Sequence, residues 1–280
     1  MHPLDRYPLQ FVSVNQHRTA YIRHGQGPPL VLLHGYAGAM WNWEHQIEPL
    51  GRHFTLFIPD VLGHGLTDKP HLAYTSAVYL EWLRGFLDAV GIERTHIAGN
   101  SMGAGLALGL ALTYPARTDR LILISGFPAQ ALTRIRGSYL ELIYRLGSGW
   151  LFALGYRCLG RRAFRQFLGN VICDPARITP AVVERCYRLR KDHGQAWPLW
   201  SSLRHLNEWE AHFAPRLKDI TAPVLILWGR DDRFLPVAIG HELHRMIPHA
   251  RFTVIPQAGH LPMWEQPADV NRLIIEFLAT

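Results

Sequence analysis

Hydrophobic residues along this chain fall into short continuous runs separated by longer stretches with helical periodicity. The short runs are apolar at nearly every position, which is typical of strands buried on both faces of a parallel sheet. They predict strands at residues 30–33, 54–58, 95–98, 121–125, 224–228 and 252–255. Two further strands, less apolar, are predicted within residues 9–24 on either side of Asn15 and Gln16, as an antiparallel lead-in.

The stretches between these runs predict helices. Residues 76–90 place apolar side chains on one helical face, and Gly91 is a natural stop. Residues 102–114 are apolar on nearly every side, which predicts a helix buried all round, and a helix is also expected over 41–50. The last helix begins near Pro267 and has one clear apolar face. The alternation predicts an α/β protein, with a mostly parallel sheet covered by helices on both faces.

Residues 129–218 interrupt this alternation. They contain no strand pattern, but they do contain helical patches rich in arginine, tryptophan and tyrosine. We therefore predict a helical cap at 129–218, inserted into a core formed by residues 1–128 and 219–280. The cap holds 15 Lys and Arg against 6 Asp and Glu, whereas the rest of the chain holds 14 against 16. The net charge of +7 therefore comes from the cap alone.

The basic surplus of the cap has several interpretations. A solvated surface is the simplest, and because no recognised nucleic-acid-binding module accompanies it, we expect no nucleic-acid partner. A lid that attracts anionic substrates, or one that rests on anionic lipid, also fits. The lipid interpretation depends on the apolar residues 149–154 and on the arginines that follow them, Arg157, Arg161, Arg162 and Arg165. Any membrane contact should be peripheral, since no apolar run reaches the roughly 18 residues that span a bilayer.

Composition narrows the class of protein further. At 280 residues, 48% hydrophobic and 18% charged, the chain is expected to be a soluble globular protein with one large domain or one domain plus an insertion. Its first ten residues lack a basic head followed by an apolar segment, so we expect no signal peptide. The three cysteines show no metal-type spacing, which favours free thiols and a cytoplasmic location. The oligomeric state stays open.

The candidate nucleophile is Ser101, within Gly99-Asn100-Ser101-Met102-Gly103. This G-x-S-x-G pattern lies between a predicted buried strand and a predicted buried helix. On such a sharp turn the serine is held in a strained conformation, and the flanking glycines let strand and helix approach. The hydroxyl then projects at the start of a helix whose first N–H groups have no internal partner. The bare pattern also fits a glycine-rich contact between strand and helix in which the serine is incidental. Only a base and an acid in the expected places distinguish these two interpretations.

A nucleophilic serine needs a base, an acid that orients the base, and donors for the oxyanion. His260 follows the last predicted strand, which is where a base is expected. The strand at 121–125 ends without a carboxylate, whereas the loop after 224–228 offers Asp231 and Asp232. One of these two should supply the acid. Either could instead pair with Arg230 or Arg233 or cap the next helix, and one of them is expected to do so.

The oxyanion donors are expected to be two backbone N–H groups. One belongs to Met102, directly after the serine, and the other to Tyr36, which follows His34-Gly35 at the end of the neighbouring strand.

With these parts in place, the sequence resembles the α/β-hydrolase fold family, in its capped form. The resemblance covers essentially the whole chain and is most specific at five motifs: HGYAG (34–38), DVLGHG (60–65), GNSMG (99–103), GRDD (229–232) and GH (259–260). The order Ser101, Asp232, His260 is the family's order of nucleophile, acid and base. The acid of relatives usually stands three residues after the glycine of this late loop, which favours Asp232 over Asp231.

The resemblance also implies structural roles for three other polar residues. His34, His64 and Asp60 lie in segments that resemble structural loops of the family, so none of them is expected to transfer protons.

The type of nucleophile narrows the chemistry that the resemblance implies. Capped relatives that cleave carbon–halogen bonds or epoxides carry an aspartate at this position, so Ser101 favours acyl transfer. His260, oriented by Asp232, would take the Ser101 proton as the hydroxyl attacks a carbonyl. His260 would then protonate the leaving group and activate water for deacylation. This scheme needs neither a metal nor an organic cofactor.

Three substrate classes fit the sequence. A carboxylic-ester hydrolase with a fairly apolar small-molecule substrate is the main expectation, because the cap is rich in aromatic residues. A carbon–carbon bond hydrolase of ring-cleavage dienoates is the alternative, because such enzymes resemble this chain at 99–103, 229–234 and Trp264-Glu265. The chain departs from their pattern at Leu261, where they usually carry tryptophan, and at Tyr36-Ala37, where they have a glycine-rich loop. A small-molecule receptor on a hydrolase fold is the alternative from another class.

Overall fold

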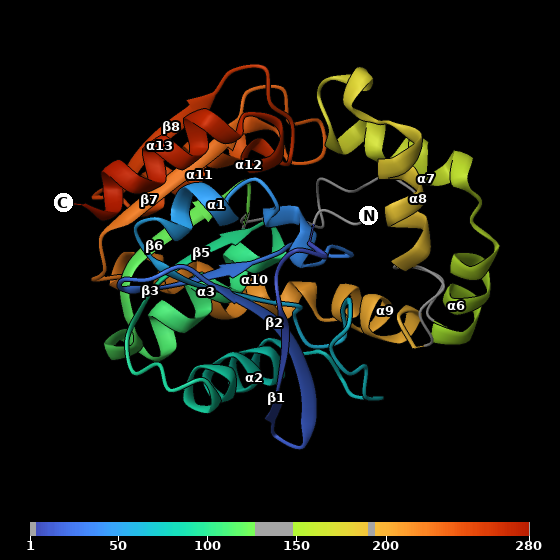
Figure 1. Cartoon of the computed structure of the whole chain (residues 1–280), viewed down its shortest axis with the longest axis horizontal. Coiled ribbons are helices and arrows are strands. Elements are labelled where there is room, and N and C mark those ends of the chain that lie inside the picture. The colour runs from blue at the N-terminus through green and yellow to red at the C-terminus, as the bar shows by residue number, and fades with distance from the viewer. Residues whose placement is uncertain (1–3, 127–147, 190–193, 280) are drawn as a thin grey trace.

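The computed structural model describes residues 4–126, 148–189 and 194–279. A single sheet of eight strands runs through it in the order β1-β2-β4-β3-β5-β6-β7-β8. β1 pairs antiparallel with β2 and β2 with β4, while every other neighbouring pair is parallel. The predicted α/β class with a mostly parallel sheet is therefore confirmed (Figure 1). The strands are β1 (Leu9–Val14), β2 (His17–His24), β3 (Pro29–Leu33), β4 (Thr55–Pro59), β5 (Thr95–Asn100), β6 (Thr118–Ile124), β7 (Val224–Gly229) and β8 (Arg251–Ile255).

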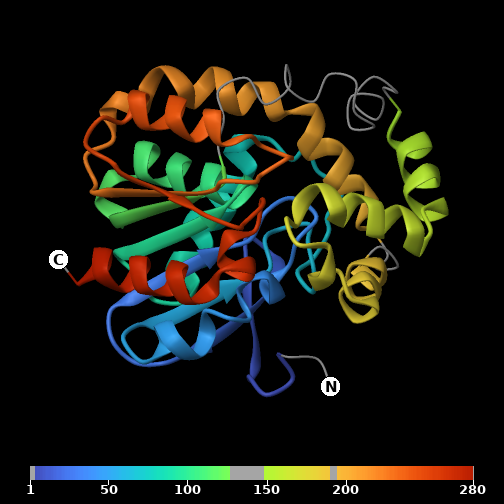
Figure 2. The same ribbon diagram turned by 90° about the horizontal axis from the view of Figure 1, so that it is seen from above.

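Helices cover both faces of this sheet (Figure 2). Those of the core are α1 (Ile47–Gly51), α2 (Ser76–Ala89), α3 (Met102–Thr113), α11 (Val237–Met246), α12 (Pro262–Glu265) and α13 (Pro267–Leu278). Those within the segment predicted as a cap are α6 (Gly149–Cys158), α7 (Arg161–Val171), α8 (Pro180–Leu189), α9 (Ala196–Arg204) and α10 (Leu206–Phe213).

One predicted helix is wrong in its extent. Residues 41–50 form a 3₁₀ turn, η1 (Met40–Trp43), and then the short α1, instead of one continuous helix. Trp41 and Trp43 explain the break, because both are buried. Positions two apart face opposite sides of a regular α-helix, so an unbroken helix would bury both rings only if it were packed on both sides, as α3 is.

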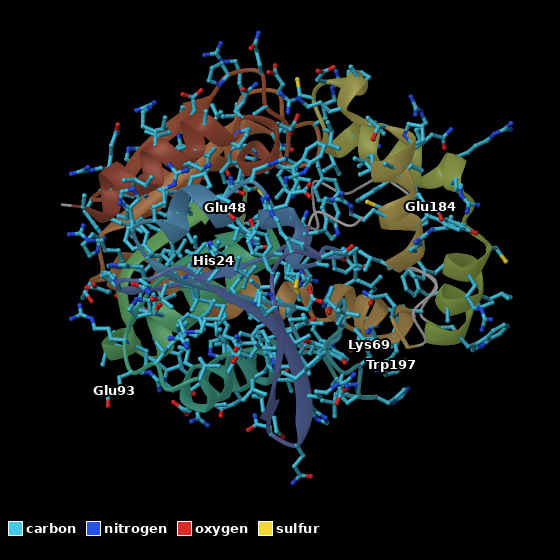
Figure 3. All side chains as sticks on the ribbon, viewed as in Figure 1. His24, Glu48, Lys69, Glu93, Glu184 and Trp197 are labelled. Atoms are coloured by element: carbon cyan, nitrogen blue, oxygen red, sulfur yellow. The ribbon has the colours of Figure 1, made fainter. Side chains whose placement is uncertain are left out.

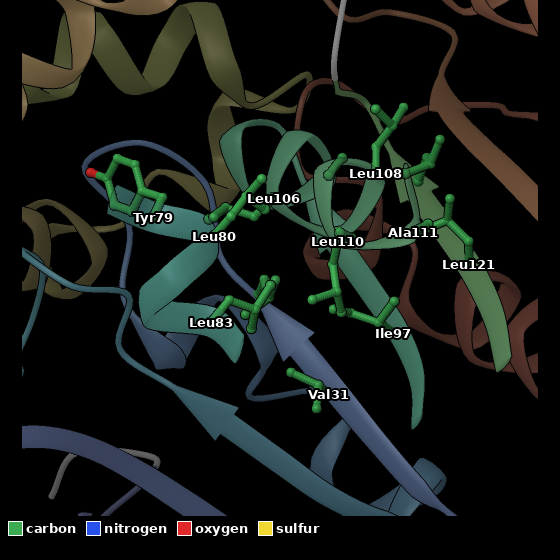
Figure 4. Close-up of a cluster of buried hydrophobic side chains, with 14 of the residues drawn as sticks. Val31, Tyr79, Leu80, Leu83, Ile97, Leu106, Leu108, Leu110, Ala111 and Leu121 are labelled. Atoms are coloured by element: carbon green, nitrogen blue, oxygen red, sulfur yellow. The ribbon is translucent and has the colours of Figure 1, made fainter. Parts of the chain in front are cut away.

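The strands supply two hydrophobic clusters because alternate side chains point to opposite faces of the sheet. In β3, Val31 and Leu33 join the cluster under α2, α3 and α11. Leu30 and Leu32 join the cluster on the other face, under η1, α1, α12 and α13. Figure 4 shows part of the first cluster, in which Val31, the β5 residue Ile97 and the α3 residue Leu110 lie together. Because these strands are buried on both faces, their sequences are continuous apolar runs.

Within its described residues, 148–189 and 194–218, the segment predicted as a cap contains helices joined by short connections and no strand. Helices α6 to α9 lie beyond one end of the sheet (Figures 1 and 2). Helix α10 instead packs against α3, and its Trp209 and Phe213 belong to the core cluster on that face. Residues 129–147 of the predicted cap lie outside the described residues, and the division into core and cap stays a prediction.

Candidate active site

Ser101 stands at the turn between β5 and α3, where it is the N-cap of the helix, with φ 55° and ψ −117°. This left-handed conformation is strained for a residue with a side chain. The flanking glycines make the turn possible. A Cβ at Gly99 would collide with the backbone of Gly103, and a Cβ at Gly103 would collide with the carbonyl of Leu33. The strand, the turn and the helix expected around Ser101 are therefore all present.

The carboxyl ends of the two neighbouring strands, β6 and β3, lie beside this turn. The backbone N–H of Ser101 donates to the carbonyl of Ile124 at the end of β6, at 2.9 Å. On the β3 side, a Cβ placed on Gly35 would lie only 3.0 Å from the Cβ of Ser101, so the backbone of this loop passes directly beside the serine. Tyr36 follows Gly35, and Met102 opens α3, where its N–H has no acceptor inside the helix. Their role as oxyanion donors stays a prediction.

His260 and Asp232 are joined directly. The Nδ1 atom of His260 lies 2.8 Å from Oδ2 of Asp232, and both residues are buried. Because a carboxylate only accepts, the proton of the neutral imidazole is assigned to Nδ1, which leaves Nε2 as the basic nitrogen. The other carboxylate oxygen, Oδ1, accepts from the N–H groups of Phe234 at 2.9 Å and Leu235 at 2.8 Å. Both oxygens of Asp232 are therefore held in place.

Asp231, the other candidate acid, is placed differently. Its side chain is exposed, and its backbone N–H donates to the carbonyl of Ala258 at 2.9 Å. We expected one of the two aspartates to supply the acid, and one of them to cap the next helix or bind an arginine. In the structure Asp232 does both, since it pairs with His260 and also caps the turn at Phe234 and Leu235.

Asn100 is a residue of this site that the sequence analysis did not select. It ends β5, one position before Ser101, and is only 1% exposed. Its Nδ2 donates to the carbonyls of Ile124 at 3.2 Å and His260 at 3.1 Å. The amide thus ties the histidine loop to the strand that carries the serine. The only signal in the sequence is a polar residue at the end of a buried apolar run.

Glu265 is the second such residue. Its carboxylate is buried and accepts from the N–H groups of Gly259 at 2.8 Å and Cys173 at 2.7 Å. The N–H of His260 also donates to Val171 at the end of α7, at 2.7 Å. Burial raises the pKa of the Glu265 carboxyl, and the N–H groups that it accepts from oppose that rise. The loop of His260 is therefore fastened to the segment that follows α7.

His34 and His64 are completely buried, and their rings meet edge to face with centroids 5.4 Å apart. The Nε2 atom of His34 accepts from the N–H of Val61 at 2.9 Å, and its Nδ1 lies 2.8 Å from the carbonyl of Gly35. Burial, reinforced by His64, lowers the pKa of His34 to about 3, and burial lowers the pKa of His64 to about 4. Both are neutral structural residues, as expected.

These two histidines predict how stability depends on pH. In the unfolded chain both side chains have a pKa near the ordinary value of 6.5. In the folded chain the pKa of His64 is about 4 and that of His34 is about 3. Between these limits the unfolded state binds more protons, so the free energy of unfolding is highest above pH 6.5 and falls as the pH decreases. Each histidine contributes a slope of up to about 1.4 kcal/mol per pH unit.

Urea unfolding at several pH values between about 7 and about 5 measures this slope. The variant His64→Asn keeps a side-chain donor near the carbonyl of Leu62 but removes one titrating group. Its free energy of unfolding should therefore fall less steeply with decreasing pH than that of the unaltered protein. Equal slopes would show that His64 does not cause the effect.

Asp60 organises the loop that follows β4. Its Oδ1 accepts from the N–H of Met40 at 2.7 Å, and its Oδ2 accepts from the N–H of Leu66 at 2.7 Å. This is the loop role expected for it.

Within the residues that the structure describes, no group of three or more histidine, cysteine, aspartate or glutamate side chains is placed to hold a metal ion. A reaction without metal or cofactor stays a prediction.

The fold and this site define a class of protein. Residues 28–267 match the family described as alpha/beta hydrolase fold, and the chain belongs to that family.

Particular relatives add detail. The 2-hydroxy-6-oxo-6-phenylhexa-2,4-dienoate hydrolase of Burkholderia cepacia is 29% identical over 285 residues, which cover 96% of each protein. Among solved structures, a meta-cleavage product hydrolase from Pseudomonas fluorescens IP01 is 25% identical with a TM-score of 0.81, over 96% of this chain and 97% of that one. A bacterial membrane phospholipase A is 26% identical with a TM-score of 0.78, over 99% of this chain and 87% of that one.

Proposed function

We propose that this protein is a serine hydrolase that cleaves a carbon–carbon bond in a 2-hydroxy-6-oxo-hexa-2,4-dienoate. The observation that carries the proposal is the full-length similarity to a hydrolase of such a dienoate, 29% identical over 96% of both proteins. This similarity supports the carbon–carbon alternative better than ester hydrolysis, which was the main expectation from the sequence. The basic surplus of the predicted cap also suits a substrate that carries a carboxylate.

In this proposal each residue of the candidate site has a role in the reaction. A proton shift from the 2-hydroxyl of the dienoate to C5 first gives a ketone at C2. Ser101 then attacks the C6 carbonyl while Nε2 of His260 takes its proton and Asp232 holds the resulting imidazolium. The N–H groups of Tyr36 and Met102 stabilise the oxyanion.

The two products follow from the collapse of that intermediate. Breaking the C5–C6 bond leaves its electron pair delocalised onto the C2 oxygen, and His260 returns the proton there. The first product is 2-hydroxypenta-2,4-dienoate. Water activated by His260 then cleaves the acyl-enzyme and releases the carboxylic acid that contains C6.

Direct comparison of two substrate sets tests the proposal. The first contains 2-hydroxy-6-oxo-hexa-2,4-dienoates with a phenyl or a methyl group at C6, followed by loss of their conjugated absorbance and by identification of benzoate or acetate. The second contains p-nitrophenyl esters from acetate to palmitate. We expect kcat/KM of about 10⁴ M⁻¹s⁻¹ or more for one dienoate, the range of an enzyme on its own substrate, and lower values for every ester. The reverse order would contradict the proposal.

Ester hydrolysis is the second candidate, and a specific observation favours it. Tyr36 stands where dienoate hydrolases usually have a glycine-rich loop, and its hydroxyl donates to the carbonyl of Leu199 in α9 at 3.0 Å. The Tyr36 side chain therefore links the loop after β3 to α9 and fills space that a glycine would leave empty. This difference from the dienoate hydrolases is what favours an ester as the substrate. Leu261, in place of the usual tryptophan, also changes the wall beside His260.

The receptor alternative predicts a different result in the same experiment. A receptor would turn over neither substrate set, yet a bound ligand would raise its Tm.

A further inference from the structure

Helix α6 is apolar on two sides. Its inner side buries Phe152, the one buried residue of the helix. Its outer side carries Trp150, 69% exposed, and Leu154, 55% exposed, which lie four positions apart and so share a face. In the part of the chain that the structure describes, seven large hydrophobic residues are exposed, and four of them lie within residues 150–159. The exposed apolar residues are therefore gathered in one place.

Arginines adjoin these apolar residues. Arg157 follows Leu154 by three positions on α6, and Arg161, Arg162 and Arg165 are exposed on α7. Arg161 is paired, since its Nε lies 2.6 Å from Oε2 of Glu184, which Figure 3 labels on α8. The described residues 149–189 nevertheless hold seven arginines and only two acidic residues. We call this region the cap surface; it comprises Trp150, Leu151, Leu154, Arg157, Leu159, Arg161, Arg162 and Arg165.

We propose that the cap surface docks this protein on a lipid bilayer that contains anionic lipids. Apolar side chains beside arginines match the two layers that a bilayer presents, because the former enter the acyl boundary while the latter meet the headgroup phosphates. An indole is especially favourable at that boundary, since one end of the ring is apolar and the other polar. A second copy of the chain fits less well, because it would bring two sets of arginines together.

The position of α6 makes such contact feasible. Figures 1 and 2 both show this helix at the outer edge of the molecule, beyond the end of the sheet, where a flat surface can reach it. Among the described helices, none is both long enough and apolar enough to cross a membrane. The contact that we propose is therefore peripheral.

Vesicle flotation tests the proposal without depending on any enzymatic activity. The full chain is floated with vesicles of phosphatidylcholine alone and with vesicles of phosphatidylcholine and phosphatidylglycerol in equal amounts. We expect binding to the anionic vesicles, weakened by salt, and little binding to the neutral ones. Replacing Trp150 and Leu154 by serine should lower the partition coefficient about tenfold or more. Arg162→Glu should lower it about fivefold or more.

Matched variants separate docking from general effects. Leu9 and Phe11, 40% and 47% exposed on β1, are replaced by serine as the apolar control. Arg245→Glu on α11 makes the same change in charge as Arg162→Glu. These controls should bind like the unaltered chain, and thermal unfolding verifies that every variant is folded.

Three results would overturn the proposal. The first is no binding to anionic vesicles. The second is equal loss of binding in the control variants and the cap-surface variants. The third is a dimer in sedimentation velocity that the Trp150 and Leu154 replacements dissociate, since the cap surface would then bind a second copy of the chain.

Discussion

Replacing Ser101 by alanine is expected to lower kcat by about 10⁶-fold, the loss typical of removing the nucleophile from a site that works as a unit. Ser101 is held in a strained conformation between closely packed glycines, and His260, its expected base, is paired with Asp232. With the Ser101 hydroxyl removed, no acyl-enzyme can form. Initial rates on the best substrate of the panel, together with labelling by a fluorophosphonate probe, measure the effect, and both signals should vanish.

The same position allows a control on stability. Alanine keeps the cost of φ 55°, whereas glycine does not, so Ser101→Gly should be more stable than Ser101→Ala by about 1 kcal/mol. Both should be equally inactive. Ser125→Ala is the matched control for activity, because Ser125 is also buried, follows the neighbouring strand and has φ 44°. Full activity in Ser101→Ala would show that Ser101 is not the nucleophile.

The sequence predicted those parts of the site that depend on local pattern and chain order. Ser101 lies in a five-residue motif between a strand and a helix, and His260 follows the last strand. Parallel strands meet at one edge of a sheet, so residues after successive strands come together even when they are far apart in the chain. This is why Asp232 and His260, 28 positions apart, could be expected to pair, as they do at 2.8 Å.

Asn100 and Glu265 could not be predicted in this way. Asn100 binds a carbonyl 160 positions away and Glu265 an N–H 92 positions away. Their partners are backbone groups, which leave no trace in the residue types of either segment. The break in the helix predicted at residues 41–50 could not be predicted for a related reason, since the tertiary packing around Trp41 and Trp43 decides that both are buried.

The choice of substrate class was the weakest inference from the sequence. Leu261 and Tyr36-Ala37 depart from the pattern of dienoate hydrolases and favoured ester hydrolysis, whereas the full-length relatives support the carbon–carbon alternative better. The candidate catalytic residues would be common to both reactions, because each includes attack of a serine on a carbonyl. The difference lies in groups that stabilise the departing carbon, which the catalytic motif does not encode.

Replacing Asp232 by asparagine is expected to lower kcat by about 10⁴-fold, as the loss of an orienting carboxylate does in a comparable triad. The asparagine carbonyl can still accept from Phe234 and Leu235, so the loop should keep its shape. Its amide group would then face Nδ1 of His260 as a donor. Such a donor requires the imidazole proton to sit on Nε2, which leaves no basic nitrogen toward Ser101. Steady-state rates of the unaltered and variant proteins measure the loss.

Asp231→Asn is the matched control, because it removes the same charge one residue away. The side chain of Asp231 is exposed, and its backbone contact with Ala258 does not depend on the carboxylate. Its kcat should therefore stay within about threefold of the unaltered protein, as is usual for a surface change away from the reacting atoms. A large loss in Asp231→Asn together with a small one in Asp232→Asn would exchange the roles of the two aspartates. Equal losses would instead point to the charge of the loop as a whole, since only the pairing with His260 distinguishes Asp232 as the orienting acid.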